Sequence, residues 1–168
     1  MKKIVIYYTF IFSLIAPVSL VFAGEATSSL NISANVVPSC SISVMPIAFG
    51  DYASARLEAG GYVNVNCQTG IPYHIALGAG SNYRPPSFWR SLSTGGPPPT
   101  LQYNLYKDST YIDVWGDSDY ANTFPYGTSL ADTSNGSEQR HPVYGRIPEN
   151  QSVPTGAYAD VVNVVVHW

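Results

Sequence analysis

The stretch GYVNVNC, residues 61–67, alternates apolar and polar side chains at every step. Val63, Val65 and Cys67 therefore share one face of an extended chain, and the two asparagines lie on the other. This alternation predicts a half-buried β-strand whose final residue, Cys67, points into the core.

Similar segments recur along the chain between turns rich in Gly, Pro, Asn and Asp, and no stretch has the period of a helix. We expect antiparallel strands at residues 40–45, 72–77, 101–106, 111–115, 141–147 and 158–168. Pro46 ends the first of these strands or places it at a sheet edge. The last strand is apolar on both faces, so we expect it to be covered on both faces and paired on both edges. One of its faces carries Val162, Val164, Val166 and Trp168.

Composition supports a single globular β domain. The 168 residues are 45% hydrophobic and 11% charged, and they include 14 Gly, 13 Pro and 13 Tyr. Such a chain is too apolar and too weakly charged for a disordered protein. With 8 Lys and Arg against 11 Asp and Glu, it carries no basic surface for a nucleic-acid backbone, so we expect no nucleic-acid partner.

The N-terminus resembles an export signal. Lys2 and Lys3 precede an uncharged apolar run, which closes with VFA at residues 21–23. Small residues at that exit favour signal-peptidase cleavage after Ala23, so residues 1–23 are predicted to be a signal peptide. The run is longer than a typical signal core, and an uncleaved membrane anchor is the alternative.

Export determines how the two cysteines are interpreted. Thiols in an oxidising compartment are usually bridged, so we expect a Cys40–Cys67 disulfide that links the first strand to the second. Closing that loop removes about 3–4 kcal/mol of unfolded-state entropy. A catalytic cysteine would need a nearby His or a C-x-x-C pair, and neither cysteine has one.

Residues 24–37 contain one more alternating segment, before the first cysteine. Its apolar positions are Leu30, Ile32, Ala34 and Val36. One interpretation makes it the first strand of its own sheet, since strands adjacent in sequence usually pair. The other makes it an arm that completes a neighbouring molecule.

Two further segments are rich in turn residues. Residues 81–100 form a long Pro-rich loop, and its Phe88 and Trp89 either cap the core or form an exposed tip; we favour the cap. Residues 118–140 are polar and are expected to be irregular.

Several motifs, in order, resemble the spore coat protein U domain family, which includes the subunits of archaic chaperone-usher pili. The matching pieces are AFGDY at 48–52, VNVNC at 63–67, LQYNLYKD at 101–108, VWGD at 114–117, VYGRIP at 143–148 and VPTGAYAD at 153–160. They cover essentially residues 40–168. One departure lies in the Pro-rich loop, where the usual Arg-x-Met is replaced by Arg90-Ser91-Leu92.

The resemblance implies an all-β, immunoglobulin-like antiparallel sandwich at residues 38–168 that lacks its last strand. A donor strand from another subunit, residues 24–37, would complete it. The implied donor residues are Leu30, Ile32, Ala34 and Val36, and the implied acceptor groove is formed with the terminal strand, Val162, Val164, Val166 and Trp168.

The implied partners are neighbouring pilus subunits, a periplasmic chaperone and an outer-membrane usher. The protein would be secreted through the periplasm into a cell-surface pilus that serves attachment and biofilm formation. The alternative is a secreted spore or cell-surface coat protein, and neighbouring chaperone and usher genes would distinguish the two.

We expect no enzyme, no cofactor and no metal. The three histidines His74, His141 and His167 are scattered, without metal-ligand spacing. Four aspartates are expected to have turn and surface roles, because they lack the residue pattern of a calcium-binding loop: Asp108, Asp113, Asp117 and Asp119. Arg146 is expected to pair with a carboxylate at the rim of the fold.

Overall fold

The computed structural model describes residues 24–96 and 98–168, and the predicted signal peptide lies outside them. The chain divides into two units, one up to Asn35 and one from Val36 onward. Residues 24–39 carry no strand or helix, and Leu30, Ile32 and Val36 are 84%, 87% and 85% exposed. Among the described residues, no helix has the length and apolarity needed to span a membrane.

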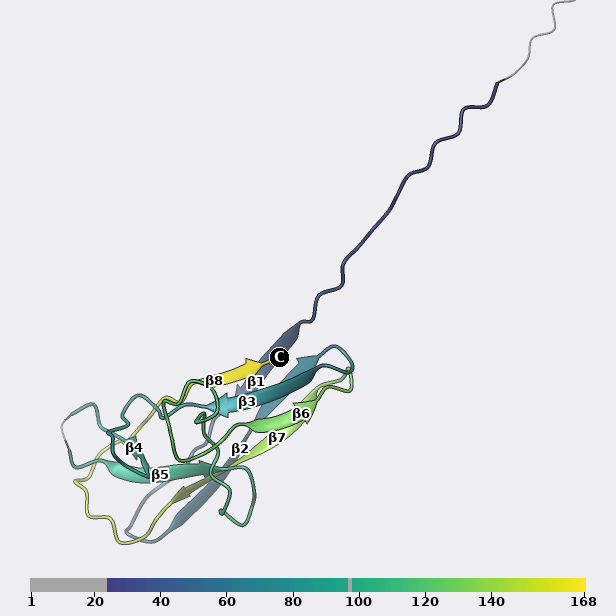
Figure 1. The fold of residues 1–168 in the computed structure, drawn as a ribbon. Coiled ribbons are helices and arrows are strands. Elements are labelled where there is room, and N and C mark those ends of the chain that lie inside the picture. The colour runs from purple at the N-terminus through teal and green to yellow at the C-terminus, as the bar shows by residue number, and fades with distance from the viewer. Residues whose placement is uncertain (1–23, 97) are drawn as a thin grey trace, which may run out of the picture. The chain divides into compact units, whose positions relative to one another are not determined.

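The second unit consists of two antiparallel sheets, which confirms the all-β prediction (Figure 1). One sheet has five strands in the order β1-β2-β7-β5-β4, and the other has three in the order β6-β3-β8. The strands are β1 Cys40–Met45, β2 Leu57–Cys67, β3 Pro72–Leu77, β4 Arg90–Leu92, β5 Leu101–Tyr106, β6 Leu130–Thr133, β7 Gln139–Ile147 and β8 Val164–His167.

Strand β2 is an interior strand of the larger sheet. It pairs with β1 on one side and with β7 on the other, from Leu57 opposite Ile147 to Val65 opposite Gln139. As the alternation predicted, Val63, Val65 and Cys67 are almost fully buried, at 1%, 1% and 3% exposure. The apolar face of this strand is one side of the core.

Strand β1 lies at the edge of the larger sheet. An edge position was one of the two alternatives that Pro46 predicted for this strand. Cys40 lies directly opposite Cys67 in the β1–β2 register, and the predicted disulfide joins them. The bridge fixes the first residue of this edge strand to the last residue of β2.

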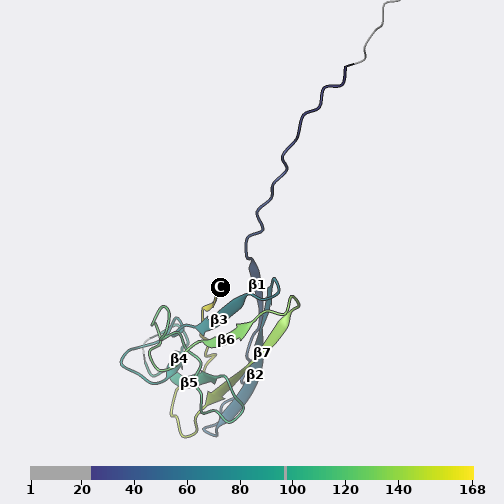
Figure 2. The same cartoon turned by 45° about the vertical axis from the view of Figure 1, so that its right-hand side comes forward.

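The other side of the core is strand β3. Its Tyr73, Ile75 and Leu77 are 0%, 0% and 1% exposed, and they belong to the same buried cluster as Val63 and Val65. Figure 1 shows the smaller sheet in front of β1, β2 and β7, and Figure 2 shows it beside them. In both views the C-terminus lies at the same end of the unit as the start of β1.

Three predictions about secondary structure were wrong. The expected strand at 111–115 is reduced to isolated bridges at Val114 and Trp115. Strands β4 and β6 lie in segments that we expected to be irregular. Both are short strands at sheet edges, and backbone pairing with β5 and β3 holds them without an alternating apolar face to mark them in the sequence.

The last strand also differs from its prediction. Regular pairing is confined to β8, while Ala159 makes only an isolated bridge to Ser93. Within residues 36–168 as described, β8 pairs with β3 alone. Val165 is 45% exposed and Trp168 59% exposed, so the expected second neighbour and full cover are missing.

The favoured role of Phe88 and Trp89 as a core cap was wrong as well. Phe88 is 45% exposed, and neither residue belongs to the buried clusters. Their rings pack edge to face at 5.4 Å, and Phe88 packs against Tyr126 at 5.5 Å. The two rings form part of a surface cluster of aromatic residues instead.

Candidate functional site

An apolar groove separates the edge strands β1 and β8. We call this side of the unit the open seam. The groove has a volume of about 980 Å³, and residues from both sheets border it. Its borders include Val44 of β1, the segment 46–52, the segment 151–162, and Val164 of β8.

On the β1 side of the groove, core-facing residues are left uncovered. Ile42 lies opposite Val65 and Val44 opposite Val63, so each pair shares the core face of the sheet. The two valines of β2 are 1% exposed, whereas Ile42 is 42% and Val44 52% exposed. The difference arises because no strand of the smaller sheet covers β1 in the described unit.

On the β8 side, Val166 and Val164 lie opposite Ile75 and Leu77 of β3, which places them on the core face. The other edge of β8 has no strand partner among residues 36–168, so its outward N–H and C=O groups are available for pairing. The open seam thus combines an uncovered apolar face with an unpaired strand edge.

The floor of the groove reaches the core itself. Leu77, Leu101, Tyr103 and Ile147 are each at most 4% exposed, yet they border the cavity. Large apolar side chains entering the groove would therefore contact core residues directly.

Hydrogen bonds hold the two segments that form the rims. The Tyr52 hydroxyl donates to the carbonyl of Pro148 at 2.9 Å and accepts from the Gln151 N–H at 2.9 Å. The Tyr103 hydroxyl donates to Asp160 at 2.7 Å. Burial, together with the charge of Asp160, raises the pKa of Tyr103.

Sequence reasoning did not assign a role to Tyr52 or to Asp160. Both lie within motifs that carried the family resemblance, AFGDY and VPTGAYAD. That resemblance was the signal that could have identified them.

The predicted acceptor residues are not all equivalent. Val162 and Val164 border the groove. Val166 is 8% exposed in the core, and Trp168, which follows β8, is 59% exposed. The predicted donor positions Leu30, Ile32 and Ala34 belong to the other unit of the chain, and Val36, the first residue of this unit, is not among the residues that border the groove.

The opposite side of the unit is the closed seam, where residues 114–116 join the two sheets. Val114 bridges to Tyr106 of β5, and the N–H of Trp115 donates to the carbonyl of Leu105 at 2.9 Å. The carbonyl of Gly116 accepts from the N–H of Leu77 in β3 at 3.1 Å. The Trp115 side chain is fully buried, and its Nε1 donates to the carbonyl of Ile75 at 2.7 Å.

A buried cation reinforces the closed seam. Arg90 is 0% exposed and donates to the carbonyls of Gly78, Leu77 and Trp115 at 2.9, 2.9 and 2.8 Å. Its guanidinium also lies 4.0 Å from the centre of the Phe124 ring. Burial lowers the pKa of Arg90 to about 10, so the group stays charged at neutral pH.

The remaining candidates for chemistry have structural partners. The Asp117 carboxylate accepts from the N–H groups of Thr123 and Phe124, and Asp119 accepts from Ser129. Arg146 pairs with Glu58 at 2.8 Å, as predicted for a rim ion pair. Within residues 24–96 and 98–168, no group of three or more His, Cys, Asp or Glu could hold a metal ion.

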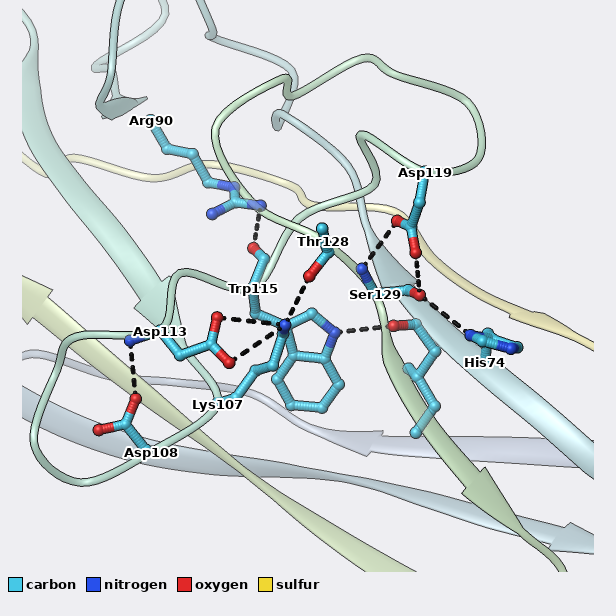
Figure 3. A network of polar contacts seen from close by, with 10 residues as sticks. His74, Arg90, Lys107, Asp108, Asp113, Trp115, Asp119, Thr128 and Ser129 are labelled. Atoms are coloured by element: carbon cyan, nitrogen blue, oxygen red, sulfur yellow. Dashed lines mark hydrogen bonds and ion pairs between the residues drawn. The ribbon is translucent and has the colours of Figure 1, made fainter.

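The histidines lie apart from the groove. His141 Nε2 is 2.8 Å from the Tyr73 hydroxyl, and His167 stacks on Tyr120 at 4.0 Å. His74 Nδ1 is 3.3 Å from the Ser129 hydroxyl (Figure 3). None of these pairs includes a nucleophile and base beside a cavity that could bind a substrate.

A similar arrangement of strands occurs in a solved structure. A chain in the CsuC–CsuE chaperone–tip adhesion subunit pre-assembly complex, from archaic chaperone-usher Csu pili of Acinetobacter baumannii, superposes with a TM-score of 0.57 at 22% identity. The match covers 79% of this chain and 40% of that chain, so this protein spans less than half the length of its structural neighbour. The fold is thus like that of a Csu pilus subunit.

Sequence comparisons agree with the structural match. Protein U of Myxococcus xanthus is 30% identical in an alignment 158 positions long, which covers 83% of this chain and 83% of that protein. The family model for the Spore Coat Protein U domain matches residues 26–165. This chain therefore belongs to the Spore Coat Protein U domain family, a non-enzymatic family of pilus and coat proteins.

Proposed function

We propose that this protein is a structural subunit of a chaperone-usher pilus and polymerises by donor-strand complementation. Residues 24–37 of one copy occupy the open seam of the next and complete an immunoglobulin-like sandwich. The observation that carries the proposal is the groove of about 980 Å³ between an uncovered β1 and an unpaired edge of β8.

The groove has the two features that strand addition requires. The outer edge of β8 offers main-chain groups to an extended segment, which supplies affinity, and the apolar cavity accepts every second side chain, which supplies register. Ile42 and Val44, exposed by 42% and 52%, would be covered by the added strand.

The arm has the matching pattern. Leu30, Ile32, Ala34 and Val36 lie on one face of an extended chain. Burying the three larger side chains contributes about 1.5–3 kcal/mol each, and therefore about 5–9 kcal/mol before the cost of ordering the arm. Together with main-chain hydrogen bonds along the outer edge of β8, this burial would hold subunits together without a covalent link.

Donor and acceptor lie at different places on the same molecule, so the contact is head-to-tail. Head-to-tail contacts that do not close into a ring produce a filament. An unfilled groove exposes apolar surface and a bare strand edge, which invites aggregation. A periplasmic chaperone that covers the groove until an outer-membrane usher delivers the next subunit resolves that problem during export to the cell surface.

The proposal is tested by mixing two complementary variants. Ile32→Asp places a charge on the apolar face of the arm and leaves the groove intact. Val44→Lys places a charge in the groove at a half-exposed site, so the fold is retained, and leaves the arm intact. Each variant alone should remain monomeric, whereas the mixture should give a one-to-one dimer and no longer species.

Ser33→Asp and Val165→Lys serve as matched controls. Ser33 is on the polar side of the arm, and Val165 is a 45% exposed valine of β8 that does not border the groove. Both control variants should polymerise like the wild type in size-exclusion chromatography and electron microscopy. Polymers formed by Ile32→Asp or by Val44→Lys alone would refute the donor and groove assignments.

A secreted spore or cell-surface coat protein is the second candidate. It is favoured by the family description and by the 30% identity to Protein U of Myxococcus xanthus. Genes for a chaperone and an usher beside this gene support the pilus, and their absence supports the coat. Biofilm assays of a deletion strain would then test the attachment role.

A further inference from the structure

A second, shallow pocket lies on the closed seam. Its volume is about 370 Å³, within the range of small-molecule sites, and Tyr126 forms one side of it. It is lined by Ile112, Asp113, Val114, Ser118, Pro125, Tyr126, Gly127 and Thr128. None of these residues borders the groove of the open seam.

The backbone around the pocket is tightly fixed. Gly116 and Gly127 pack against each other so closely that a Cβ on Gly127 would lie 2.5 Å from the carbonyl oxygen of Val114. The N–H of Ser118 donates to the carbonyl of Gly127 at 3.0 Å, and the N–H of Gly116 to that of Thr128 at 3.0 Å. A side chain at either position would collide with the facing backbone, so the two glycines permit this close contact beside the pocket.

Two residues that line the pocket, Asp113 and Thr128, belong to an ordered polar network (Figure 3). Lys107 Nζ lies 3.2 and 3.3 Å from the two carboxylate oxygens of Asp113 and donates to the Thr128 hydroxyl at 2.8 Å. Asp108 accepts from the N–H groups of Thr110 and Asp113, each at 2.8 Å. The hydrogen bond from the Thr110 hydroxyl is the main cause that lowers the pKa of Asp108 to about 2. The turn that carries Asp113 is therefore set before any ligand arrives.

Other residues that line the pocket present apolar surface. Tyr126 is 40% exposed and Ile112 80% exposed. The Tyr126 ring packs against Phe88 at 5.5 Å and against the buried Phe124 at 5.8 Å. An exposed aromatic ring that is braced from behind loses little conformational entropy when it binds a ligand.

Together these groups define the chemistry of the ligand. An aromatic face beside a pair of fixed hydrogen-bonding groups suits a ring with apolar C–H faces and hydroxyl edges. Because Lys107 compensates the charge of Asp113, the pocket favours neither an anion nor a cation. We propose that the pocket beside Tyr126 binds a neutral saccharide.

This inference does not depend on the proposed assembly, because the pocket belongs to a single copy of the chain. If the copies do form a filament, filling the groove does not by itself cover this pocket, because the two share no lining residue. Each subunit would then carry one weak site, and the repeated sites would act together through avidity.

The test uses the purified full chain and saturation-transfer NMR. The probes are glucose, galactose, mannose, N-acetylglucosamine and their disaccharides, with N-acetylneuraminic acid as the anionic comparison. At least one neutral probe should bind saturably, and more tightly than the anion. Tyr126→Ala and Asp113→Asn should each weaken binding by about tenfold or more.

Two variants separate binding from folding. Tyr126→Phe keeps the ring and its packing, so it should retain binding. Tyr120→Ala removes an aromatic ring that is 38% exposed but lies outside the pocket, and should leave binding unchanged. The inference is overturned if no neutral probe binds, if Tyr126→Ala and Asp113→Asn bind like the wild type, or if Tyr120→Ala weakens binding equally. Fibre formation by the same samples tests the assembly proposal separately.

Discussion

The two seams of this unit differ in backbone pairing and in the burial of their side chains. At the closed seam, residues 114–116 make main-chain hydrogen bonds to strands of both sheets, and Trp115 and Arg90 are 0% exposed. At the open seam, β1 and β8 face each other across a cavity, and Val44 on the core face is 52% exposed. At the closed seam, backbone groups are hydrogen-bonded and apolar side chains are buried. At the open seam, an unpaired strand edge and exposed apolar side chains remain for a partner to cover.

This division between a closed and an open seam lets one chain be stable and still be ready to assemble. Buried backbone groups cost free energy unless they are paired, so a seam without pairing must stay solvated or acquire a strand. The closed seam, with its fixed tryptophan and arginine, holds the two sheets in place while the open seam stays available.

The largest expected effect comes from breaking the closed seam. Trp115→Ala removes a fully buried indole and its hydrogen bond to Ile75, and should lower the free energy of unfolding by about 3–5 kcal/mol. Val44→Ala, at the half-exposed open seam, should cost less than about 1 kcal/mol in the isolated subunit. Urea denaturation of both variants measures the contrast, and equal losses would contradict it.

The next effect concerns how β1 is held at the open seam. Replacing both cysteines, Cys40→Ala with Cys67→Ala, should lower the free energy of unfolding by about 3–4 kcal/mol, since the disulfide limits the unfolded chain. We further expect faster hydrogen exchange in β1 than in β7, because β1 is paired on one side only. If loss of the disulfide accelerated hydrogen exchange equally in all strands, it would argue against an edge strand β1 that depends on the bridge.

The smallest effect is a pH dependence at a polar link between the sheets. His141 of β7 contacts the hydroxyl of Tyr73 in β3 at 2.8 Å, and Asp132 of β6 lies 3.8 Å from its Nε2. Burial lowers the pKa of His141 below its ordinary value, and the Asp132 charge only partly opposes this. The unfolded chain therefore binds the proton more readily, and stability should fall as the pH drops below about 6.5.

Thermal unfolding measures that dependence. Between about pH 7 and pH 5, the melting temperature of the wild type should fall more steeply than that of His141→Gln. Both proteins contain the same carboxylates, so their titration cancels in the comparison. Parallel curves would show that protonation of His141 does not limit the stability of this link.

Much of the fold was predictable from local pattern. The alternation of Val63, Val65 and Cys67 predicted a strand with one buried face, and both the strand and its buried face were found. The disulfide followed from export, and the edge position of β1 was one of the two outcomes that Pro46 predicted. The strand was inferred from the period of its side chains, and the edge position from the missing N–H of a proline. Both are local properties of the chain.

The candidate site was predictable only in part. Of the four predicted acceptor residues, Val162 and Val164 border the groove, whereas Val166 packs inside the core and Trp168 is 59% exposed. All four share one face in the sequence pattern. Alternation reports which face of a strand is apolar, but it carries no information on what lies opposite that face.

Patterns in the amino-acid sequence were enough to predict the strand class, the buried faces, the cysteine bridge and the family. They did not predict that β8 has a single neighbour among the described residues, that β4 and β6 exist, or that Arg90 is a buried cation bound to three carbonyl oxygens. The two groups of features differ in the range of the interactions that produce them. Periodicity and turn chemistry act over a few residues, whereas edge pairing and burial depend on segments that are distant in sequence and meet only in the folded chain.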